Sequence, residues 1–547
     1  FRRRPRSASD RAQFAAHTLL GPEEGGGACE FESDRATFLG RGNDVTTAVG
    51  PHGPLAGGVG ATLDPVMALA QPVALQPNGQ AVFTFITAFA ESRKALVGLI
   101  DHLRLPGIVA REFGLARMRS RLEMRQYELT PERVESYQRL LSAIVYPDRE
   151  LRAPTATLAA NTLGQSSLWG QGISGDFPIL LVRLDDHEHL PLVVELLHAH
   201  AYWRRRAVKV DLVVLNAKDT AYDQALHARL RWHLSHTGGD EWLNARGGIY
   251  LLRQDQLAPA DLKLLESAAT VLLEGRGGTL GEQLMATREV WQPGLPRSAP
   301  VRAPEPEPVA PAATAPEKLA FANGVGGFSA DGREYVMKVK PGALPPAPWS
   351  NVMANSALGC LTTEAGLGPT WSVNSGENRL TPWSNDPVSD PSAEVVYLRD
   401  EETVEAWSAT PHPAGADVPF EVRHGAGYTT YAHVSHGLEQ KLEVSVAASD
   451  PVKLAHLRVR NLLDRPRRVT VTYYAEWVLG VDRRTTSMYV LPDYDPQRCA
   501  VLARNPYAAD FGERVAFLAS NKSPHGVTTD RREFLGALGA AAAPDAL

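Results

Sequence analysis

Lys453-Leu-Ala-His-Leu-Arg-Val-Arg460 and Arg468-Val-Thr-Val-Thr-Tyr-Tyr-Ala475 are consecutive segments in which apolar and polar side chains alternate. Successive side chains of a β-strand point to opposite faces, so this alternation predicts two strands with one face on a core. Turn signals, among them Arg465-Pro466 between the two segments, recur through this part of the chain. Their spacing predicts a large antiparallel β-sandwich over residues 319–547. The preceding residues 291–318 are Pro-rich, favour extended polyproline II and therefore predict a linker.

Residues 173–290 have a different pattern, in which apolar runs alternate with helical periodicity. The apolar runs are short, as are strands of a parallel sheet that is buried on both faces. The pattern predicts a small α/β layer with strands at Pro178–Leu184, Val210–Leu215 and Gly248–Leu252 and helices at Leu190–Arg205, Tyr222–Ser235 and Pro259–Leu273. A nucleotide site at the strand ends is an alternative role for this layer, but no Gly-rich phosphate loop follows any of the three expected strands.

The first 172 residues change from β to helical character. Residues 1–98 are predicted to be the C-terminal part of a first β-sandwich, because Ala81–Phe89 is rich in β-branched and aromatic side chains. Residues 99–172 are predicted to be a helical connector. Within it, apolar residues recur three and four positions apart over Glu132–Val145.

Two short motifs occur twice in the same order. Arg11-Ala-Gln-Phe14 returns as Arg514-Val-Ala-Phe517, and Asp34-Arg-Ala-Thr-Phe-Leu-Gly40 returns as Asp530-Arg-Arg-Glu-Phe-Leu-Gly536. Two matches in one order indicate two copies of one sandwich. We expect the first copy to enter near its end and the second to be truncated at its C-terminus, after the repeat.

Composition argues against several classes of function. The chain has 547 residues, which predicts three or four domains, and its net charge of −6 is spread along the sequence. Nucleic-acid binding by a basic stripe is therefore not expected. No apolar run reaches the ~18 residues of a membrane span, and no signal peptide is evident. Three scattered cysteines, Cys29, Cys360 and Cys499, fit a reducing compartment and have no metal or redox spacing.

The run from Trp371 to Asp390 gathers the side chains that sugar recognition uses. One polar, turn-rich stretch holds two indoles, an arginine, three carboxylates and three Asn amides. Indole faces stack on the C–H faces of pyranose rings, while carboxylate, amide and guanidinium groups bind the hydroxyls. We therefore expect a carbohydrate site formed by Trp371, Arg379, Trp383 and Asp386. The same composition also suits an ordinary loop capped by Asx turns.

A series of motifs in a fixed order surrounds this run: Asn323–Tyr335, Pro346–Asn355, Glu364–Trp371, Tyr397–Asp400, Arg423–Tyr428 and Val471–Gly480. Together they resemble the N-terminal β-sandwich of the inverting disaccharide phosphorylases, the cellobiose and chitobiose phosphorylase family. The sequence looks most similar to the version found in bacterial cyclic β-1,2-glucan synthases, and Leu163–Pro178 resembles the segment that joins the two sandwich modules of those synthases. The resemblance covers nearly the whole chain. It implies a multidomain, β-rich fold with large antiparallel β-sandwich (supersandwich) modules joined by a helical and α/β connector.

The resemblance also implies a function and partners. The chain would be the carbohydrate-binding and scaffolding portion of a cyclic β-1,2-glucan synthase, a glycosyltransferase with phosphorylase-like control of chain length. Its ligand would be a β-glucan oligosaccharide or polysaccharide, and its protein partners would be the (α/α)6 barrel and transferase domains of the parent chain. The implied location is cytoplasmic, on the cytoplasmic face of the inner membrane through the parent protein. The alternatives are a stand-alone carbohydrate-binding or scaffold protein and a truncated β-glucan phosphorylase.

No catalytic residue is expected in this chain. In the phosphorylases that it resembles, the general acid is an Asp in an Asp-Trp-Asn-Asp-type motif on the barrel, and no such motif occurs here. Trp383-Ser-Asn-Asp386 is only superficially similar. A paired-carboxylate glycosidase built on Glu377, Asp386 and Asp390 is the rival hypothesis, since glycoside hydrolysis needs two carboxylates about 5 to 10 Å apart.

Three groups of histidines are candidate metal ligands. Neither Asp185-Asp-His-Glu-His189 nor His198-Ala-His200 has the i, i+4 histidine spacing of a zincin, and Asp185–His189 is expected to form a solvated strand-to-helix turn. His424, His433 and His436 fall on expected strands and turns, where hydrogen-bonded structural histidines are the preferred interpretation. We expect no metal and no cofactor in this chain.

Overall fold

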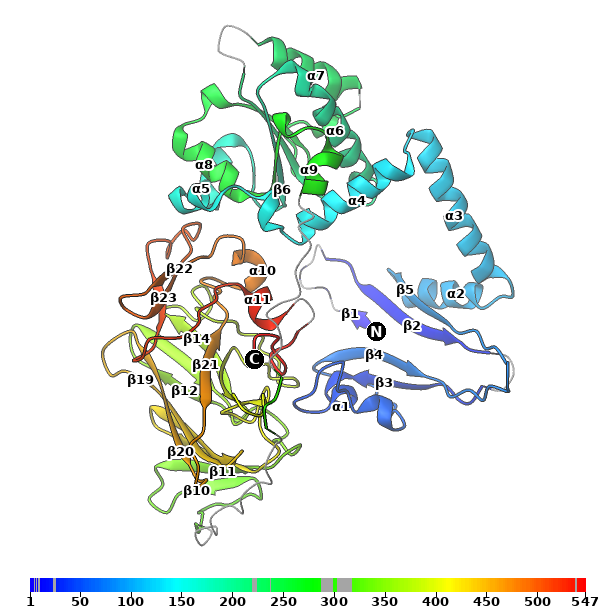
Figure 1. The fold of residues 1–547 in the computed structure, drawn as a ribbon. Coiled ribbons are helices and arrows are strands. Elements are labelled where there is room, and N and C mark those ends of the chain that lie inside the picture. The colour runs from blue at the N-terminus through cyan, green and yellow to red at the C-terminus, as the bar shows by residue number, and fades with distance from the viewer. Residues whose placement is uncertain are drawn as a thin grey trace. The chain divides into compact units, whose positions relative to one another are not determined.

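The elements of the chain are drawn in Figure 1, from a computed structural model that describes residues 1–547 except residues 4, 6, 8–9, 23–25, 219–223, 237, 287–298, 303–316 and 537–538. The described residues group into two units. Unit 1 consists of Phe1–Thr130, Leu344–Pro348 and Asn385–Pro391, and unit 2 consists of Pro131–Ala343, Trp349–Ser384 and Ser392–Leu547. Most of the predicted linker, residues 291–298 and 303–316, lies outside the described residues, and the domain boundaries expected from the sequence stay predictions.

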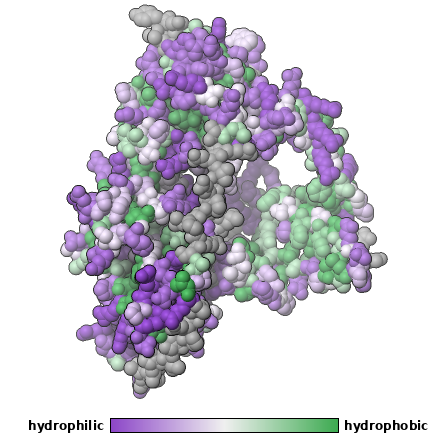
Figure 2. Space-filling view, in the orientation of Figure 1, coloured by the Kyte–Doolittle hydropathy of each residue, from purple (hydrophilic) through white to green (hydrophobic). Residues whose placement is uncertain are grey.

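Unit 1 is built on a three-stranded antiparallel sheet. Its elements are β1 (Arg2–Arg3), β2 (Gln13–Leu20), β3 (Glu30–Asp34), α1 (Arg35–Leu39), β4 (Pro65–Ala70), β5 (Thr84–Ala90), α2 (Arg93–Leu103) and α3 (Ile108–Gln126). The sheet order is β1-β2-β5, α2 packs on β5 and β2, and β3 pairs separately with β4. Alternation along β5 buries Ala88, whereas Phe85 and Phe89 lie on the opposite face and are exposed. Hydrophobic side chains gather on the surface of this unit (Figure 2).

Unit 2 begins with helices α4 (Pro131–Val145) and α5 (Thr155–Ala160) and continues into a parallel α/β layer. The strands lie in the order β8-β7-β6-β9, and all three pairings are parallel. The elements of this layer are β6 (Ile179–Leu184), α6 (Leu190–Arg204), β7 (Asp211–Asn216), α7 (Ala225–His236), β8 (Ile249–Arg253), α8 (Pro259–Ala268), β9 (Ala269–Glu274) and α9 (Leu280–Ala286). Strands β6 and β7 are almost wholly buried, as their continuous apolar sequence requires.

One helix expected in this layer is wrong at its C-terminal end. The helix predicted over Pro259–Leu273 ends at Ala268, and the next six residues form strand β9 beside β6. Periodicity does not distinguish a short buried strand from a buried helical segment, and the pairing with β6 decides for the strand. A Gly-rich turn at residues 275–278 therefore follows a strand that the sequence analysis had assigned to a helix.

The rest of unit 2 is an antiparallel β-sandwich with a small third sheet. Its strands are β10 (Gly326–Phe328), β11 (Glu334–Val339), β12 (Asn351–Ala354), β13 (Leu358–Thr362), β14 (Leu367–Ser372), β15 (Glu394–Asp400), β16 (Ala406–Ser408), β17 (Phe420–Gly425), β18 (Tyr428–Ser435), β19 (Leu438–Val446), β20 (Lys453–Asn461), β21 (Val469–Ala475), β22 (Leu491–Asp495), β23 (Ala500–Arg504) and β24 (Ala516–Ala519). One sheet runs β10-β11-β17-β18-β19-β20, the facing sheet runs β12-β13-β14-β15-β16 with β21 also on β15, and the third runs β22-β23-β24. Two short helices, α10 (Arg483–Thr486) and α11 (Arg531–Leu535), complete the unit.

Buried polar contacts join the two large sheets. The hydroxyls of Thr362 on β13 and Thr429 on β18 lie 2.9 Å apart, and the buried Trp407 indole on β16 donates to Gln440 Oε1 on β19 at 2.9 Å. The Tyr431 hydroxyl on β18 donates to the Thr363 carbonyl beyond β13 at 2.6 Å. These contacts make the two sheets faces of one core and confirm the β-rich sandwich fold expected from the sequence.

The sequence repeat is also a structural repeat. Asp34 caps α1 with φ −103° and ψ 117°, and Asp530 caps α11 with φ −102° and ψ 116°. Each cap carboxylate accepts a backbone N–H two residues on, and each helix ends at a glycine with positive φ, Gly40 at 79° and Gly536 at 89°. An L side chain rarely adopts that conformation, which explains the glycine in both copies. The first motifs of the repeat lead into strands β2 and β24 in the same way.

Candidate functional site

The run predicted as a sugar-binding loop begins on a strand. Trp371 belongs to β14, where it faces Gly359 of β13 across the antiparallel ladder. A Cβ atom on Gly359 would come within 2.4 Å of the Trp371 ring, so the indole lies directly over this glycine. Trp371 is consequently half-buried and held by the sheet. The strand was missed because Leu367–Ser372 contains Gly and Pro, which are uncommon in strands.

Arg379 ties the loop to the sandwich. Its backbone forms bridges with Trp371 and with Gly480, with N–H to carbonyl distances of 3.0 and 3.1 Å to Gly480. Its guanidinium donates from Nε to the Ser375 carbonyl at 2.9 Å and from Nη1 to the Val481 carbonyl at 3.0 Å. A guanidinium has five N–H donors, so these two bonds fix the group and leave donors for a ligand.

Trp383 lies beside that guanidinium. The Arg379 Cζ atom is 5.3 Å from the centroid of the Trp383 ring, a cation–π distance, and the tryptophan keeps 39% of its surface exposed. The structure therefore brings Arg379 next to Trp383 through its guanidinium and next to Trp371 through a backbone bridge. An exposed indole and a fixed guanidinium with free donors are what a pyranose ring needs on its C–H face and at its hydroxyls.

Asp386 has a different set of partners. It belongs to unit 1, where Arg35 of α1 donates to Oδ1 at 2.9 Å and to Oδ2 at 2.7 Å. Oδ1 also accepts the N–H of Val388 at 2.9 Å and of Ser389 at 3.3 Å, and the Ser389 hydroxyl donates to Oδ2 at 2.5 Å. The Arg35 guanidinium holds the pKa of the Asp386 carboxyl well below its usual range. Five donors fill the acceptor positions of one carboxylate, which leaves little capacity for sugar hydroxyls.

The rest of the segment Asn385–Pro391 is bound in the same way within unit 1. Arg41 donates to Asp390 Oδ2 at 3.0 Å, and the Gly42 N–H donates to the Val388 carbonyl at 2.7 Å. The Val388 side chain is buried in a cluster with Leu39 and Ala48. We call this arrangement the α1 clasp: α1 and the residues after it hold Asn385–Pro391 by two ion pairs and one buried apolar contact.

The carboxylates of the run do not have the environment of an acid–base pair. A general acid needs a raised pKa, and that of Asp386 is lowered. Asp390 is paired with Arg41, and Glu377 is exposed on the turn before Arg379. The arrangement suits binding better than glycoside hydrolysis.

A buried ionic network that the sequence analysis missed supports the base of the loop. Glu394 on β15 accepts hydrogen bonds from the Thr370 hydroxyl at 2.5 Å and the Thr381 hydroxyl at 3.0 Å, one on each side of the Trp371–Arg379 turn. Lys453 lies 3.0 Å from Oε2, and the Tyr473 hydroxyl also donates there. Burial acts to raise the pKa of Glu394, but Lys453 and the hydroxyls outweigh it and hold the pKa below its ordinary value. The sequence does carry a signal for this network, since the carboxylate of Glu394 stands directly before the apolar run Val395–Leu398 of β15.

The histidine segments behave as structural elements. The His189 Nδ1 atom lies 2.9 Å from Asp185 Oδ1, and Arg276 pairs with the same carboxylate. Within the described ranges, no three His, Cys, Asp or Glu side chains could hold a metal ion together. His424 is hydrogen-bonded as expected, to Thr429 at 3.0 Å and to the Trp349 carbonyl at 2.9 Å. For His433 the expectation of hydrogen bonds is wrong: among the described residues neither ring nitrogen has a partner, and the buried ring packs on Phe420.

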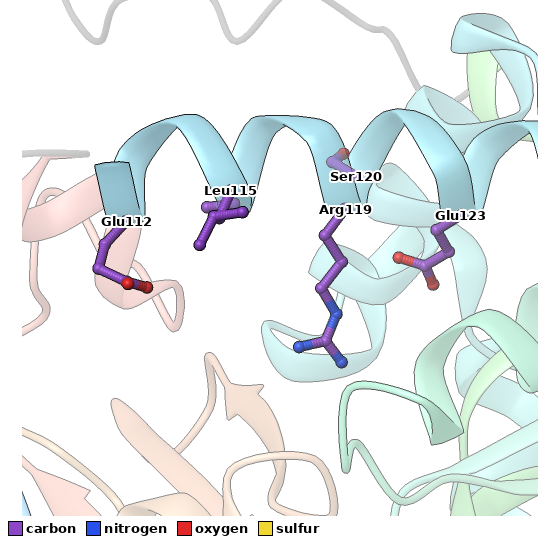
Figure 3. A pocket seen from close by; sticks show the side chains of 6 residues that line it. Glu112, Leu115, Arg119, Ser120 and Glu123 are labelled. Atoms are coloured by element: carbon purple, nitrogen blue, oxygen red, sulfur yellow. The ribbon is translucent and has the colours of Figure 1, made fainter. Parts of the chain in front are cut away.

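A hollow in unit 1 follows one face of α3 (Figure 3). Its lining is spaced three and four residues apart on this single helix: Glu112, Leu115, Ala116, Arg119, Ser120 and Glu123. Polar groups from one helix face do not converge on a ligand, so the hollow has no features of a binding pocket. No residue of α3 is buried. Across the described part of the chain, no helix is long and apolar enough to span a membrane.

Comparison with known proteins places this geometry in a family context. The family described as glycosyl hydrolase 94, supersandwich domain, matches residues 1–106 and 333–547. The chain is 34% identical over 563 aligned positions to the cyclic beta-(1,2)-glucan synthase NdvB of Rhizobium meliloti (strain 1021), which covers 100% of this chain and 20% of that protein. It is 27% identical over 155 positions to the N,N'-diacetylchitobiose phosphorylase of Vibrio furnissii, covering 28% of this chain and 19% of the relative. The corresponding phosphorylase of Vibrio proteolyticus is 25% identical over 219 positions, 39% of this chain and 27% of the relative. The chain thus spans about one fifth of the length of the synthase.

Proposed function

Because this chain belongs to the glycosyl hydrolase 94 supersandwich domain family, we propose that it is the carbohydrate-binding and scaffolding portion of a cyclic β-1,2-glucan synthase. The proposed ligand is a β-glucan oligosaccharide or polysaccharide. Its contacts are Trp383 and Arg379, and Trp371, which is bridged to Arg379 through the backbone and packs over Gly359, helps to fix the position of Arg379. Asp386, which the sequence placed in the same site, is reassigned to the α1 clasp.

The observation that carries this proposal is the exposed Trp383 beside an immobilised guanidinium. The two carbonyl bonds of Arg379 fix its position, so binding a sugar costs little side-chain ordering. Stacking on the indole face contributes on the order of 1 kcal/mol, and a charge-assisted hydrogen bond contributes a similar free energy. Together they give weak but specific binding of one sugar ring. A polymer that presents many rings strengthens such binding through avidity.

The scaffolding part of the proposal rests on the Glu394 network. The Thr370 and Thr381 hydroxyls bind one buried carboxylate, which in turn pairs with Lys453 of the facing sheet. Breaking a buried ion pair costs about 3 to 5 kcal/mol, so the base of the loop is fixed by the sandwich core. The proposed partners are the catalytic barrel and transferase domains of a longer protein, and the proposed location is the cytoplasmic side of the inner membrane.

Titration calorimetry with β-1,2-gluco-oligosaccharides tests the proposal. Trp383→Ala should weaken binding about fivefold, since ~1 kcal/mol of stacking is lost. Because Trp383 is already 39% exposed, its truncation should lower the free energy of unfolding by only about 1 to 2 kcal/mol, less than the 3 to 5 kcal/mol of a core tryptophan. Trp232→Ala is the matched control, because Trp232 is 56% exposed and one side of its ring is already occupied by the His236 ring, which is tilted by 32° at a centroid distance of 3.8 Å. Equal affinity in wild type and Trp383→Ala, with a large loss of stability, would assign the loop to structure.

A further inference from the structure

A second exposed indole lies on the segment before the α/β layer. Trp169 belongs to the 3-10 helix Gln165–Gln171 and keeps 64% of its surface exposed. Its Nε1 atom donates to the Ser174 carbonyl at 3.3 Å, so the ring has one preferred orientation. No aromatic ring or cation among the described residues stacks on it, in contrast to Trp232, whose ring is covered by His236. Trp169 therefore presents a fixed and open aromatic surface.

The turn that follows Trp169 is built to hold this orientation. Gly172 and Gly175 adopt φ values of 75° and 73°, which favour glycine and allow the chain to double back. The Ser174 carbonyl accepts a hydrogen bond from Gln165 Nε2 at 3.0 Å in addition to the one from Trp169. A Cβ atom on Gly175 would come within 2.8 Å of Gln165 Cγ, so the amide side chain packs closely against the turn.

A charged pair with unused hydrogen-bonding capacity lies at this turn: Asp176 belongs to the turn itself, and Arg246 reaches it from the loop before β8. Asp176 accepts from Gln165 Nε2 at 3.3 Å through Oδ1 and from Arg246 Nη2 at 2.5 Å through Oδ2, and both charged side chains are at least half exposed. The Arg246 Cζ atom also lies 5.3 Å from the Phe177 ring centroid. A carboxylate offers about four acceptor positions and a guanidinium five donors, so this pair can still bind hydroxyls. The five donors around Asp386 leave it little such capacity.

From this juxtaposition we infer that Trp169, Asp176 and Arg246 form a second contact site for a neutral hexose ring. The indole would stack on the C–H face, while the carboxylate accepts and the guanidinium donates hydrogen bonds to neighbouring hydroxyls. An anionic ligand fits less well, because Asp176 already balances the charge of Arg246. The hexose would be a glucose unit of the glucan that the proposed function assigns to this chain, so this inference rests on that function. One polysaccharide could then occupy two sites on unit 2.

The test uses the full chain labelled with 5-fluorotryptophan, whose fluorine resonances report each indole separately. Trp169→Phe and Trp383→Phe assign the two signals, and β-1,2-gluco-oligosaccharides are the titrant. We expect both resonances to shift with saturation. Asp176→Ala should raise the midpoint at the Trp169 signal about fivefold or more and leave the midpoint at the Trp383 signal unchanged. The Trp232 signal is the internal control and should not move.

The outcomes separate this inference from the proposed function. A Trp169 signal that stays still while Trp383 saturates overturns the second site and leaves the first. A Trp169 signal that saturates while Trp383 stays still supports the second site and overturns the first. Two silent signals at millimolar oligosaccharide overturn both. An equal response of the Trp169 signal in wild type and Asp176→Ala also overturns the second site, because the polar half of the site would then contribute nothing.

Discussion

Asp386→Asn should loosen the α1 clasp in unit 1 without unfolding the sandwich. The substitution keeps the shape of the side chain but removes the charge that holds two Arg35 bonds of 2.9 and 2.7 Å. Hydrogen bonds to charged groups contribute about 1.5 to 3 kcal/mol, and exposed ion pairs 0.2 to 1 kcal/mol. The Arg35 and Asp386 side chains are 26% and 20% exposed, and Arg35 keeps Asp64 at 2.8 Å as a second partner. We therefore expect a loss near the lower end of the first range, about 1.5 kcal/mol.

Amide hydrogen exchange read by mass spectrometry measures this loss locally. If the free energy of opening the α1 clasp falls by about 1.5 kcal/mol, amide exchange of the peptide that contains Asn385–Pro391 should become roughly tenfold faster. Asp390→Asn weakens the second ion pair of the clasp, in which Arg41 Nη2 lies 3.0 Å from Asp390 Oδ2 and the side chains are 11% and 18% exposed, so we expect it to speed exchange of the same peptide as well. Arg531→Met, which changes the equivalent arginine of the second repeat, should leave this peptide unchanged.

Identical exchange in wild type and Asp386→Asn would refute the clasp. The same variant also tests the reassignment of Asp386. Glucan affinity should not change, because the carboxylate is occupied by its own chain. A loss of affinity with unaltered exchange would return Asp386 to the sugar site.

Three further predictions concern pH, the linker and catalysis. Burial lowers the pKa of His433 to about 3 from about 6.5. Below pH 6.5 the unfolded chain therefore binds a proton at this histidine that the folded chain does not bind. The contribution of His433 to the free energy of unfolding is complete above pH 6.5 and falls as the pH drops toward 3. Between pH 7 and 5 wild type should lose about 2 kcal/mol more than His433→Leu in urea unfolding, and parallel curves would contradict this. Limited proteolysis should begin within Trp291–Lys318, because Pro-rich extended chain offers no protected backbone hydrogen bonds, and it should yield fragments of roughly 290 and 230 residues. A first cleavage inside Pro178–Leu273 would contradict the proposed division into domains. The isolated chain should release no glucose 1-phosphate from β-1,2-gluco-oligosaccharides and phosphate, because it lacks the acid motif of the barrel; release above a no-enzyme blank in clean protein would contradict this.

Local patterns in the sequence predicted most of the elements. The alternating segments 453–460 and 468–475 became β20 and β21, and the helical period of Glu132–Val145 became α4. The repeated Asp-Arg-x-x-Phe-Leu-Gly motif predicted a repeated local structure, because a cap residue and a C-terminal glycine act within a few residues. Strand β9 was missed, since its identity depends on pairing with β6 about 90 residues earlier.

The candidate site shows the same limit. The types of side chain in the Trp371–Asp390 run indicated sugar chemistry, and the structure does bring Trp371, Arg379 and Trp383 together. The partner of Asp386, however, is an arginine 351 positions away, and only the fold shows that the carboxylate is already bound. Glu394 was missed for a similar reason, because its partner Lys453 lies on the facing sheet.

Saturation-transfer difference NMR with a β-1,2-gluco-oligosaccharide tests the central claim most directly, because it detects which ligand protons touch the protein. The account predicts transfer to the C–H protons of the glucose rings in wild type and in Trp232→Ala. Transfer should be clearly weaker in Trp383→Ala at equal protein concentration, with that variant still folded. No transfer in wild type, or transfer of the same strength in Trp383→Ala, would contradict the claim that this sandwich binds glucan through the exposed indole beside Arg379.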